Sequence, residues 1–471
     1  MSADGRTLAL DRMREAGVSQ PAMDTFAAHY DKLAAGATGL IAESDVEPAL
    51  PDVQHADLTV DEDAARSALD ATVVITLNGG LGTSMGLAGP KSLLPVHEGL
   101  TFLDITVRQV LALRERYGVR LPLVLMDSFS TRDATVEVLD RYPELAVGDL
   151  PLDFLQSQEP KLREDDLTPV EWPADPRLEW CPPGHGDLYP SLLASGLLDR
   201  LLDAGYRFAF VSNVDNLGAV PDAALAAWFA GSGAGYAAEV CPRTEMDKKG
   251  GHLVRRRGDG RLVLRDTAQT APEEMVHFMD ADTHPYVNTN NLWFDLERLR
   301  GMLDERGGVL ELPLIRNAKT VDPTDKTSTP VIQIESAMGG AVELFEDAVS
   351  VGVTRERFAP VKTTNELLLL RSDVYRLDPR TWRLTSTVEP APVVDLVKDH
   401  YGMIGAFDAR FPAGPPSLVE ASRLQVEGDW TFGADVRVVG AVTLGEEGGR
   451  IVDGTTLAPG GTEAGHPDPP A

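Results

Sequence analysis

The sequence has few cysteines, no excess of basic residues and no long apolar run. Its two cysteines, Cys181 and Cys241, are too few for a disulfide framework or a four-thiolate metal site. We expect both to be small buried hydrophobic side chains in a protein of a reducing compartment. No run of eighteen apolar residues occurs, and the N-terminus lacks a basic head followed by an apolar stretch. We therefore expect a soluble, cytoplasmic protein.

Basic residues are strongly outnumbered. The chain has 43 Lys and Arg against 73 Asp and Glu, which gives a formal net charge of -30 at pH 7. A field of that sign repels nucleic acids and anionic membranes at long range, so we expect neither as a partner. A phosphate ligand must instead be captured by a local site of backbone amides or a few basic side chains.

The length of the chain indicates more than one structural unit. Its 471 residues, 43% of them hydrophobic, are too many for one ordinary core, so we expect one large domain with smaller appendages. An N-terminal helical segment with an acidic, solvated connector at 43–63 is expected over 1–70. The main domain is expected over 71–385 and a C-terminal domain over 386–460. The polar tail, 461–471, is expected to be disordered.

The main domain has the pattern of an α/β fold. Residues 73–77 form a short apolar run, typical of a buried parallel strand, that ends in a glycine-rich loop. Thr101 and Asp104 form a capping box before a helix. Strands at 121–126 and 208–211 and a helix near 131–139 continue the alternation. We predict a doubly wound, Rossmann-like mixed sheet, with antiparallel additions around 236–295 and ligands at the carboxyl ends of its strands.

The C-terminal domain has a different period. Val426, Phe432, Val438 and Leu444 are six residues apart. Hexapeptide periodicity of this kind predicts a short β-helix. An antiparallel pair of hairpins is the alternative. Because the segment holds only a few coils, we expect a monomer or a small homo-oligomer.

The strongest local signal is the loop LNGGLGTSMGLAGPKS, residues 77–92. Its glycines let backbone amides approach phosphate oxygens, and Lys91 adds a point charge. No other residue between 71 and 97 is charged, so Lys91 has no acidic neighbour in sequence and we expect a locally cationic loop. Pro90 before the lysine excludes a P-loop, and Met85 stands where a dinucleotide fingerprint needs glycine. A tight turn is the alternative reading of the bare pattern.

The same loop resembles the signature of the eukaryotic-type UTP:glucose-1-phosphate uridylyltransferases, and four further segments agree in order. They are WCPPGHGDLYPSLLASGLLD at 180–199, FVSNVDNLGA at 210–219, VNTNNLW at 287–293 and FAPVKTTNELLLL at 358–370. The resemblance spans about residues 70–370. Asp127, Val287 and Ala318 depart from the family pattern, which leaves the fine substrate preference open.

The resemblance implies a nucleotidyltransferase domain that uses magnesium, and it implies roles for individual residues. The UTP phosphates and the uracil would be bound by Leu77, Asn78, Gly79, Gly80, Lys91, Gln156 and Gly184. The sugar phosphate would be bound by His185, Asn213, Asn288 and Asn290. Asp215 would ligate the metal, and Lys362 and Lys91 would be the catalytic residues.

The residues support several of these roles without the family. Asp215 follows a buried strand beside the phosphate loop, as magnesium ligands commonly do, although a turn or helix cap is the alternative. His185 lies between two glycines and is either a ligand group or a structural histidine. The cluster 288–291 is too polar for a strand interior, and suits sugar hydroxyls or a turn. Lys362 is expected to emerge from a strand end into a polar site, with an ordinary surface lysine as the alternative.

The implied reaction joins glucose 1-phosphate to the uridylyl group of UTP and releases pyrophosphate. The sugar-phosphate oxygen would attack the α-phosphorus in line, a reaction that depends on positioning and charge neutralisation. A broader UDP-sugar or UDP-N-acetylhexosamine pyrophosphorylase is the alternative enzyme. A nucleotide-sugar binding protein without catalysis would be expected to lack Lys91, Asp215 or Lys362, and all three are present.

Overall fold

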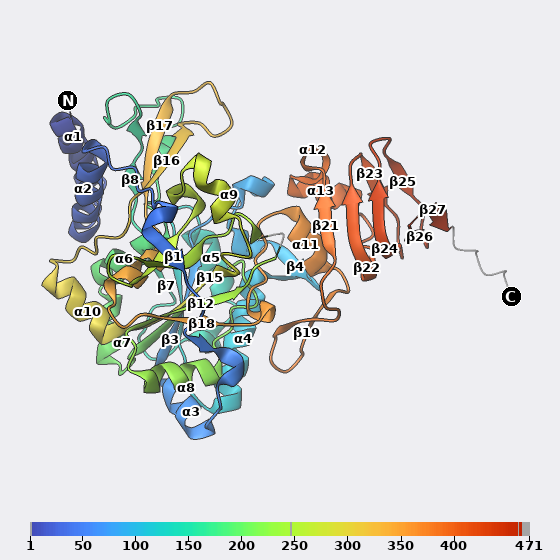
Figure 1. Ribbon diagram of the computed structural model, residues 1–471, viewed down its shortest axis with the longest axis horizontal. Coiled ribbons are helices and arrows are strands. Elements are labelled where there is room, and N and C mark those ends of the chain that lie inside the picture. The colour runs from blue at the N-terminus through green and yellow to red at the C-terminus, as the bar shows by residue number, and fades with distance from the viewer. Residues whose placement is uncertain (1, 245–246, 460, 464–471) are drawn as a thin grey trace.

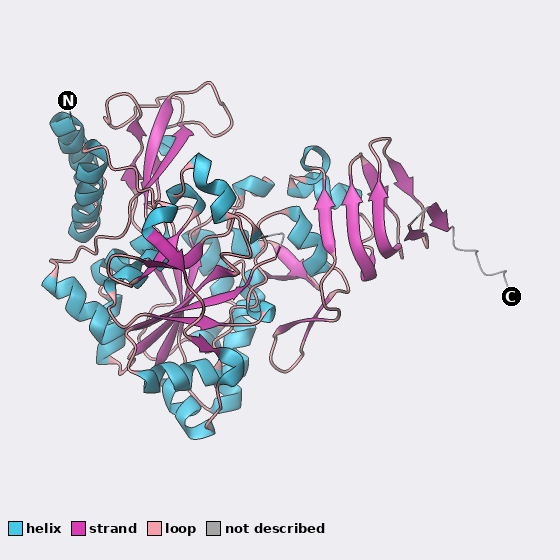
Figure 2. Cartoon of the chain, viewed as in Figure 1, coloured by secondary structure: helices cyan, strands magenta, loops and turns pink. Residues whose placement is uncertain are grey.

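The computed structural model describes residues 2–244, 247–459 and 461–463, and a mixed β-sheet forms its centre (Figures 1 and 2). The strand order is β2-β18-β12-β15-β11-β3-β6-β7. Among the described strands of this sheet, β15 alone runs antiparallel to its neighbours. The strands are β2 (Val53–Gln54), β3 (Thr72–Asn78), β6 (Leu123–Asp127), β7 (Asp153–Leu155), β11 (Phe208–Asn213), β12 (Tyr236–Pro242), β15 (Tyr286–Asp295) and β18 (Val349–Gly352).

Helices cover both faces of this sheet, as predicted for a doubly wound fold. Successive strand residues point to opposite faces, so that Val74 packs with the helices on one side and Ile75 with those on the other. The Thr101–Asp104 capping box is present at the start of α4. One face carries α3 (Glu62–Asp70), α4 (Phe102–Tyr117), α5 (Arg132–Leu139) and α8 (Ala223–Ser232), and the other carries α6 (Leu188–Ala194), α7 (Leu197–Asp203) and α10 (Leu296–Glu305).

The N-terminal helices pack on a small sheet at the edge of the main domain (Figure 1). Tyr30 and Phe26 bury their rings there against Ile332 and Ile334. The elements of this region are α1 (Ser2–Glu15), α2 (Gln20–Ala34), β9 (Leu162–Arg163), β16 (Ile315–Thr320) and β17 (Pro330–Glu335), with the short pair β8 (Glu159–Pro160) and β10 (Trp180–Cys181) beside them. Both cysteines are free and buried, as expected.

The predicted solvated connector is exposed over most of its length, but Glu43 at its N-terminal end contacts buried side chains. The carboxylate of Glu43 forms an ion pair with Arg265, whose side chain is fully buried, and a hydrogen bond with His284. Glu43 and Glu274 together offset the charge of this guanidinium, which would be strongly unfavourable without a partner. The connector then adds β1 (Val46–Pro48) to the hairpin β13 (His252–Arg256) and β14 (Leu262–Arg265), close to α9 (Met275–Phe278).

The C-terminal region contains the parallel sheet that the hexads favour over antiparallel hairpins. Val426, Phe432, Val438 and Leu444 are all buried in it. The sheet order is β21-β22-β24-β26-β27, in which β27 alone among the described strands is antiparallel, and β23 pairs with β25 in parallel alongside. The strands are β21 (Val393–Leu396), β22 (Ser417–Val426), β23 (Trp430–Phe432), β24 (Arg437–Leu444), β25 (Gly449–Ile451), β26 (Thr456–Ala458) and β27 (Gly461–Glu463).

The predicted disordered tail, 461–471, begins with strand β27, which pairs with β26. Residues 464–471 lie outside the described residues. None of the helices in the described ranges is long and apolar enough to cross a membrane.

One apolar cluster joins the C-terminal sheet to the glycine-rich loop. Met85 and Leu94 belong to the same buried cluster as Phe432. A side chain at Gly86 would collide with the sulfur of Met403, because an added Cβ would lie 2.9 Å from it. The connecting elements are β4 (Pro95–His97), β5 (Leu100–Thr101), α11 (Thr364–Arg371), β19 (Tyr375–Leu377), β20 (Leu384–Ser386), α12 (Lys398–Tyr401) and α13 (Ile404–Arg410).

Candidate active site

The predicted site residues converge at one edge of the central sheet. In the sheet register Leu77 pairs with Asn213, and Asn78 pairs with Asp127. The carboxyl ends of β3, β6 and β11 therefore lie side by side. Gln156 directly follows β7 at the same edge. Because β15 is antiparallel, its N-terminal half brings Asn288 and Asn290 to this edge as well. The arrangement follows the rule that α/β sheets bind ligands beyond the carboxyl ends of their strands.

The glycine-rich loop lies close to Gln156. An added Cβ at Gly79 would be only 2.6 Å from Nε2 of Gln156, so only glycine fits there without displacing that side chain. The backbone N–H of Lys91 donates to the carbonyl of Gly80 at 3.1 Å and closes the loop on itself. The loop therefore presents its backbone next to the predicted uracil contact.

Lys91 has no acidic neighbour in sequence, but in the folded protein it has an acidic partner. Its Nζ lies 2.5 Å from Oδ2 of Asp215, and both side chains are about one-sixth exposed. The two residues are 124 positions apart in sequence, so nothing near Lys91 in the chain reveals the contact. The candidate phosphate-binding lysine and the candidate metal ligand are thus direct neighbours.

The asparagine cluster forms part of strand β15, so the prediction that it is too polar for a strand is wrong. The strand tolerates these residues because it bulges: Ala238 pairs with Leu292 but Val240 with Asn288. Asn290 has φ +62°, a left-handed conformation that asparagine adopts more readily than most residues.

The bulge brings the cluster to the end of β11. Nδ2 of Asn290 donates to Oδ1 of Asn213 at 3.1 Å, and the backbone N–H of Asn290 donates to Oδ1 of Asn288 at 3.3 Å. An added Cβ at Gly339 would contact the amides of both Asn288 and Asn290. Three side-chain amides thus gather where sugar hydroxyls are expected.

His185 is half-buried, and one ring nitrogen is already used. Its Nδ1 accepts a hydrogen bond from the backbone N–H of Met338 at 3.0 Å, which assigns the proton of the neutral ring to Nε2. Burial lowers the pKa of His185, and the charge of Asp266 opposes this only in part. The residue is therefore a neutral donor through Nε2 rather than a cation.

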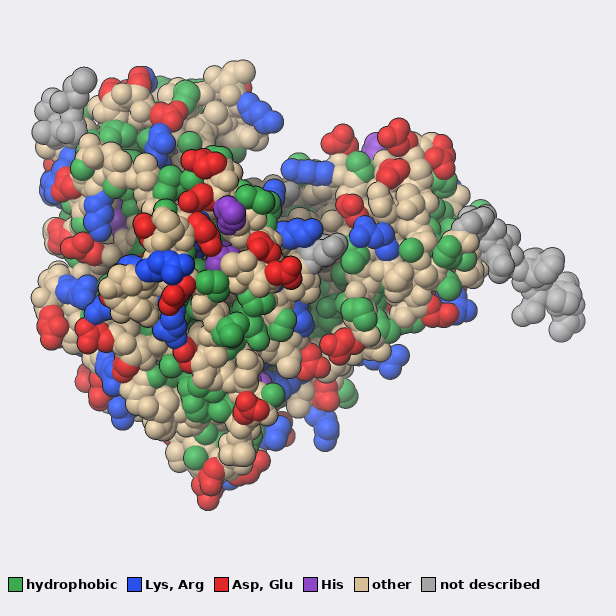
Figure 3. Space-filling model, viewed as in Figure 1, with side chains coloured by type: hydrophobic (Ala, Val, Ile, Leu, Met, Phe, Trp, Pro, Cys, Tyr) green, Lys and Arg blue, Asp and Glu red, His purple; other side chains and the backbone are tan. Residues whose placement is uncertain are grey.

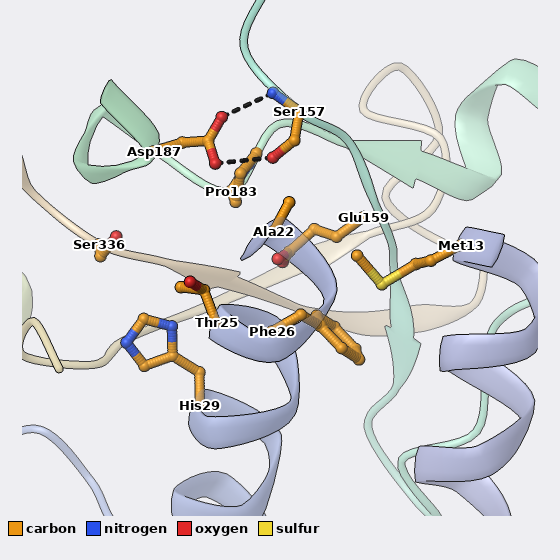
Figure 4. A pocket seen from close by; sticks show the side chains of 10 residues that line it. All are labelled: Met13, Ala22, Thr25, Phe26, His29, Ser157, Glu159, Pro183, Asp187 and Ser336. Atoms are coloured by element: carbon orange, nitrogen blue, oxygen red, sulfur yellow. Dashed lines mark hydrogen bonds between the residues drawn. The ribbon is translucent and has the colours of Figure 1, made fainter. Parts of the chain in front are cut away.

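Asp187, for which the sequence indicated no role, holds the loops at Gln156 and Gly184 together. The backbone N–H and the hydroxyl of Ser157 donate to its carboxylate at 2.6 and 2.7 Å (Figure 4). The hydroxyl of Ser191 is a third donor. The bonds tie the loop after Gln156 to the turn that contains Gly184. Burial raises the pKa of Asp187 to about 6, against the effect of the serine donors.

The turn at Gly184 is itself tightly constrained. Its φ is +78°, and an added Cβ would lie 2.5 Å from the carbonyl oxygen of Ser336. A small cavity behind it is lined by Ser157, Pro183, Asp187 and residues of α1 and α2 (Figure 4). The N-terminal helices therefore support the loops at Gln156 and Gly184 from behind.

Lys362 is exposed, but its backbone lies beside Asp215. The N–H of Val361 donates to the carbonyl oxygen of Asp215 at 3.1 Å. In the described part of the chain no hydrogen bond or ion pair involves the Lys362 ammonium. The structure thus brings Lys362 to the site through its backbone and leaves its side chain in solvent.

Asn78 offers only its backbone to a phosphate, because its side chain is buried beneath the loop. Nδ2 of Asn78 donates to Oδ1 of Asp127 at 2.7 Å and to Thr135 at 2.9 Å. Oδ2 of Asp127 and Oδ1 of Asn78 are buried without a hydrogen-bond partner in the described residues. Burial raises the pKa of Asp127 to about 6, although hydrogen bonds from Thr131 and Asn78 oppose the rise.

The donor set at Asp215 fits a magnesium ion that is held mainly by substrate. Within the described residues no group of three or more His, Cys, Asp or Glu side chains is placed to hold a metal. Magnesium in phosphate-transfer sites commonly takes one or two carboxylates, with substrate phosphates and water as its other ligands. A single carboxylate next to a phosphate loop is compatible with that mode and not with a closed structural site.

The chain matches known proteins over nearly its full length. A family model described as UTP–glucose-1-phosphate uridylyltransferase matches residues 23–438. A protein of that name from Hordeum vulgare is 39% identical over 403 residues, which cover 84% of this chain and 82% of the relative. One from Saccharomyces cerevisiae is 39% identical over 389 residues, which cover 82% and 76%.

Solved structures give the same result. A mutant UDP-glucose pyrophosphorylase from Leishmania major, in complex with UDP-glucose, is 42% identical with a TM-score of 0.91, and the match covers 97% of this chain and 98% of that one. A Trypanosoma brucei enzyme described as UDP-glucose phosphorylase is 41% identical with a TM-score of 0.88, covering 97% and 99%. The α/β fold with its large mixed sheet is therefore that of these enzymes.

The Asp127→Asn variant should gain stability in a pH-dependent way. Because the folded-state pKa is raised from 3.8 to about 6, the wild-type protein loses stability as pH rises through this window. A neutral amide removes that loss, and the gain at pH 7.5 should reach about 2 kcal/mol. At pH 5 it should be smaller by about 1 kcal/mol. Urea denaturation at both pH values measures the difference.

The exposed Asp140 at the end of α5 provides the control. Asp140→Asn should show no comparable change between pH 5 and pH 7.5. An equal gain for Asp127→Asn at the two pH values would mean that Asp127 titrates like an ordinary surface carboxylate.

Proposed function

The chain belongs to the UTP–glucose-1-phosphate uridylyltransferase family, and from that membership we propose how its own residues carry out the reaction. It is a nucleotidyltransferase that joins UTP and glucose 1-phosphate to give UDP-glucose and pyrophosphate. The observation that best supports the proposal is the Lys91–Asp215 contact at the sheet edge, between the glycine-rich loop and the asparagine cluster.

UTP is proposed to bind along the glycine-rich loop. The backbone of Leu77, Asn78, Gly79 and Gly80 would donate to the phosphate oxygens, and Lys91 would supply positive charge. Gln156 and Gly184 would read the uracil edge, which needs both a donor and acceptors. The fit of Gly79 against Gln156 supports this position for the base.

Glucose 1-phosphate is proposed to bind on the other side of Asp215. Asn213, Asn288 and Asn290 would hydrogen-bond the sugar hydroxyls, with Nε2–H of His185 as a further donor. A neutral histidine suits this role, since it donates a hydrogen bond and does not add a charge that would hold the product.

Asp215 is proposed to be the protein ligand for magnesium. When bound there, the ion would neutralise negative charge on the polyphosphate and so lower the barrier to attack. Once the Asp215 carboxylate is engaged in this way, the Lys91 ammonium is available to the UTP phosphates.

The transfer step is proposed to be an in-line displacement. An oxygen of the sugar phosphate forms a bond to the α-phosphorus of UTP, the bond from that phosphorus to the bridging oxygen breaks, and pyrophosphate leaves with that electron pair. No protein base is required because the attacking phosphate is already ionised. Lys91 and Lys362 would stabilise the negative charge on the transferring group.

The C-terminal hexads are proposed to form a short β-helix. The β23–β25 ladder supports this, because it adds a second set of parallel strands beside the main C-terminal sheet. With so few coils we propose a monomer or a small homo-oligomer.

Pyrophosphate release from a panel of substrates tests the activity and its selectivity. Purified protein with magnesium should turn over UTP and glucose 1-phosphate faster than any other pairing of a nucleoside triphosphate and a sugar 1-phosphate. Equal rates with N-acetylglucosamine 1-phosphate or galactose 1-phosphate would instead favour a broader UDP-sugar pyrophosphorylase. Asp127, Val287 and Ala318 are the departures that leave this open.

Loss of the metal ligand should remove most of the activity. Chelation of divalent ions should abolish turnover, and Asp215→Ala should lower the rate by at least about a hundredfold. The reason is that the substrates bring several negative charges into a site with few cations. Steady-state rates across a magnesium titration measure this, and full activity of Asp215→Ala would exclude the assignment.

Removal of Lys362 should reduce turnover more than UTP affinity. If its ammonium follows the charge that develops in the transition state, Lys362→Ala should lose roughly a hundred- to a thousandfold in rate. Lys362→Arg should restore only part, since a planar fork does not replace a compact charge. Calorimetry of UTP binding beside steady-state rates measures both, and equal losses would make Lys362 only a nucleotide-binding residue.

A further inference from the structure

The Lys362 segment and the turn after β11 lie side by side although about 145 residues separate them in sequence. Asn216 forms an isolated antiparallel bridge with Pro360, and Val361 donates to the carbonyl of Asp215. Two backbone contacts therefore connect the segment that carries Lys362 with the turn that carries Asp215.

The side chain of Asn216 reinforces this junction. Its Oδ1 accepts from the backbone N–H of Ala359 at 2.9 Å, and its Nδ2 donates to the carbonyl of Arg357 at 3.1 Å. The same Nδ2 lies 3.2 Å from Oδ1 of Asn291 in β15. With 5% of its surface exposed, this amide is committed to protein contacts and does not reach a substrate.

The segment is also held from behind by a buried ion pair. The guanidinium of Arg357 donates to both carboxylate oxygens of Glu239 in β12, at 2.7 and 2.8 Å. Asn291 and Trp293 donate to the same carboxylate. Charged hydrogen bonds with this bidentate geometry are among the more rigid contacts in proteins, so Arg357 is a fixed point five residues before Lys362.

Lys362 itself has no such support. Its side chain is exposed and, within the described residues, forms no hydrogen bond or ion pair. A lysine side chain has several rotatable bonds, so the reach of its ammonium is set by where its backbone is anchored. Pro360 and Val361 at the junction are the last residues before it that are fixed to the sheet.

We propose that Asn216 is a positioning residue of the uridylyl transfer, which holds the Lys362 segment at a fixed distance from Asp215. The inference rests on the proposed role of Lys362. The amide of Asn216 anchors the segment at Arg357 and Ala359, and the Val361–Asp215 backbone hydrogen bond then sets the distance from Asp215 at which the Lys362 side chain begins.

A double-mutant cycle with Lys362→Ala tests this. Asn216→Ala should lower kcat by roughly ten- to a hundredfold while the Kd of UTP changes by less than about threefold. In the Lys362→Ala background the same change should cost less than about threefold more, because the group that Asn216 positions is already gone. Steady-state kinetics and calorimetry on the four full-length proteins measure the cycle.

Gln109→Ala is the matched control. Gln109 is also a buried amide that donates to two carbonyls, and one of them belongs to Leu217, next to Asn216. Among the residues that the structure describes, it makes no hydrogen bond to the Lys362 segment. Its removal should lower the melting temperature as Asn216→Ala does, but its effect on rate should be small and should multiply with that of Lys362→Ala.

Asn216→Ser guards against a variant that does not fold. Its hydroxyl is neutral and can both donate and accept, so it should show a smaller loss in kcat that again vanishes with Lys362→Ala. Independent, multiplying losses would overturn the proposal, as would full activity of a folded Asn216→Ala. If Lys362→Ala alone keeps the full rate, the role of Lys362 fails and the inference fails with it. If Lys362→Ala lowers the rate but the effects of Asn216→Ala and Lys362→Ala are independent, the role of Lys362 stands and only the positioning role of Asn216 fails.

Discussion

A glutamate buried in the middle of a sheet must have a positive partner, and much of the active-site edge is arranged around that requirement. Glu239 lies within the apolar strand β12, with its side chain fully buried, and Arg357 supplies the charge that offsets its lost hydration. To reach Glu239, the segment 355–361 must cross the end of the sheet beside β11. The ion pair thus links the segment before Lys362 to the asparagine cluster of β15, because Asn291 also donates to Glu239.

Because the protein carries a large net negative charge, any phosphate must be bound by groups in its immediate surroundings. On the face drawn in Figure 3, acidic and basic side chains are interspersed and do not gather into one basic area. Backbone amides have no counter-charge to lose, so the glycine-rich loop can serve the proposed phosphate site in an acidic protein. Lys91 is different, because in the structure its charge is already compensated by Asp215. Under the proposed mechanism, a metal ion at that carboxylate would free the charge of Lys91 for a phosphate.

Much of the fold was predictable because it depends on local patterns. The apolar run at 73–77, the Thr101–Asp104 cap and the six-residue spacing at Val426 and Phe432 each report on neighbouring residues, and each prediction agrees with the structure as far as strand, cap and parallel sheet. That the site residues gather at one sheet edge could be predicted from the rule for parallel strands. The contacts among them could not be predicted, since the Lys91–Asp215 pair joins residues that no local pattern connects.

The asparagine cluster and the buried Glu239–Arg357 ion pair are the features that the sequence did not predict. By composition alone the run 288–291 is too polar for a strand interior, but its side chains alternate between two faces of β15. Thr289 and Asn291 point inward to Glu239, whereas Asn288 and Asn290 face the site. The sequence does contain one indication of this arrangement, the single glutamate in the apolar segment YAAEVC. A charged side chain in a buried strand requires polar partners on the neighbouring strand.

Three carboxylates lie near the proposed nucleotide site, and they differ in how far their negative charge is compensated by neighbouring groups. Asp215 faces the site and is compensated by Lys91. Asp187 is buried, but three donors from Ser157 and Ser191 stabilise its ionised form. Asp127 accepts hydrogen bonds through Oδ1, while its Oδ2 is buried without a partner in the described residues. It is therefore the least compensated of the three. Protonation relieves the cost of burying its charge, and it would also remove a repulsion from a nucleotide phosphate bound at the proposed site.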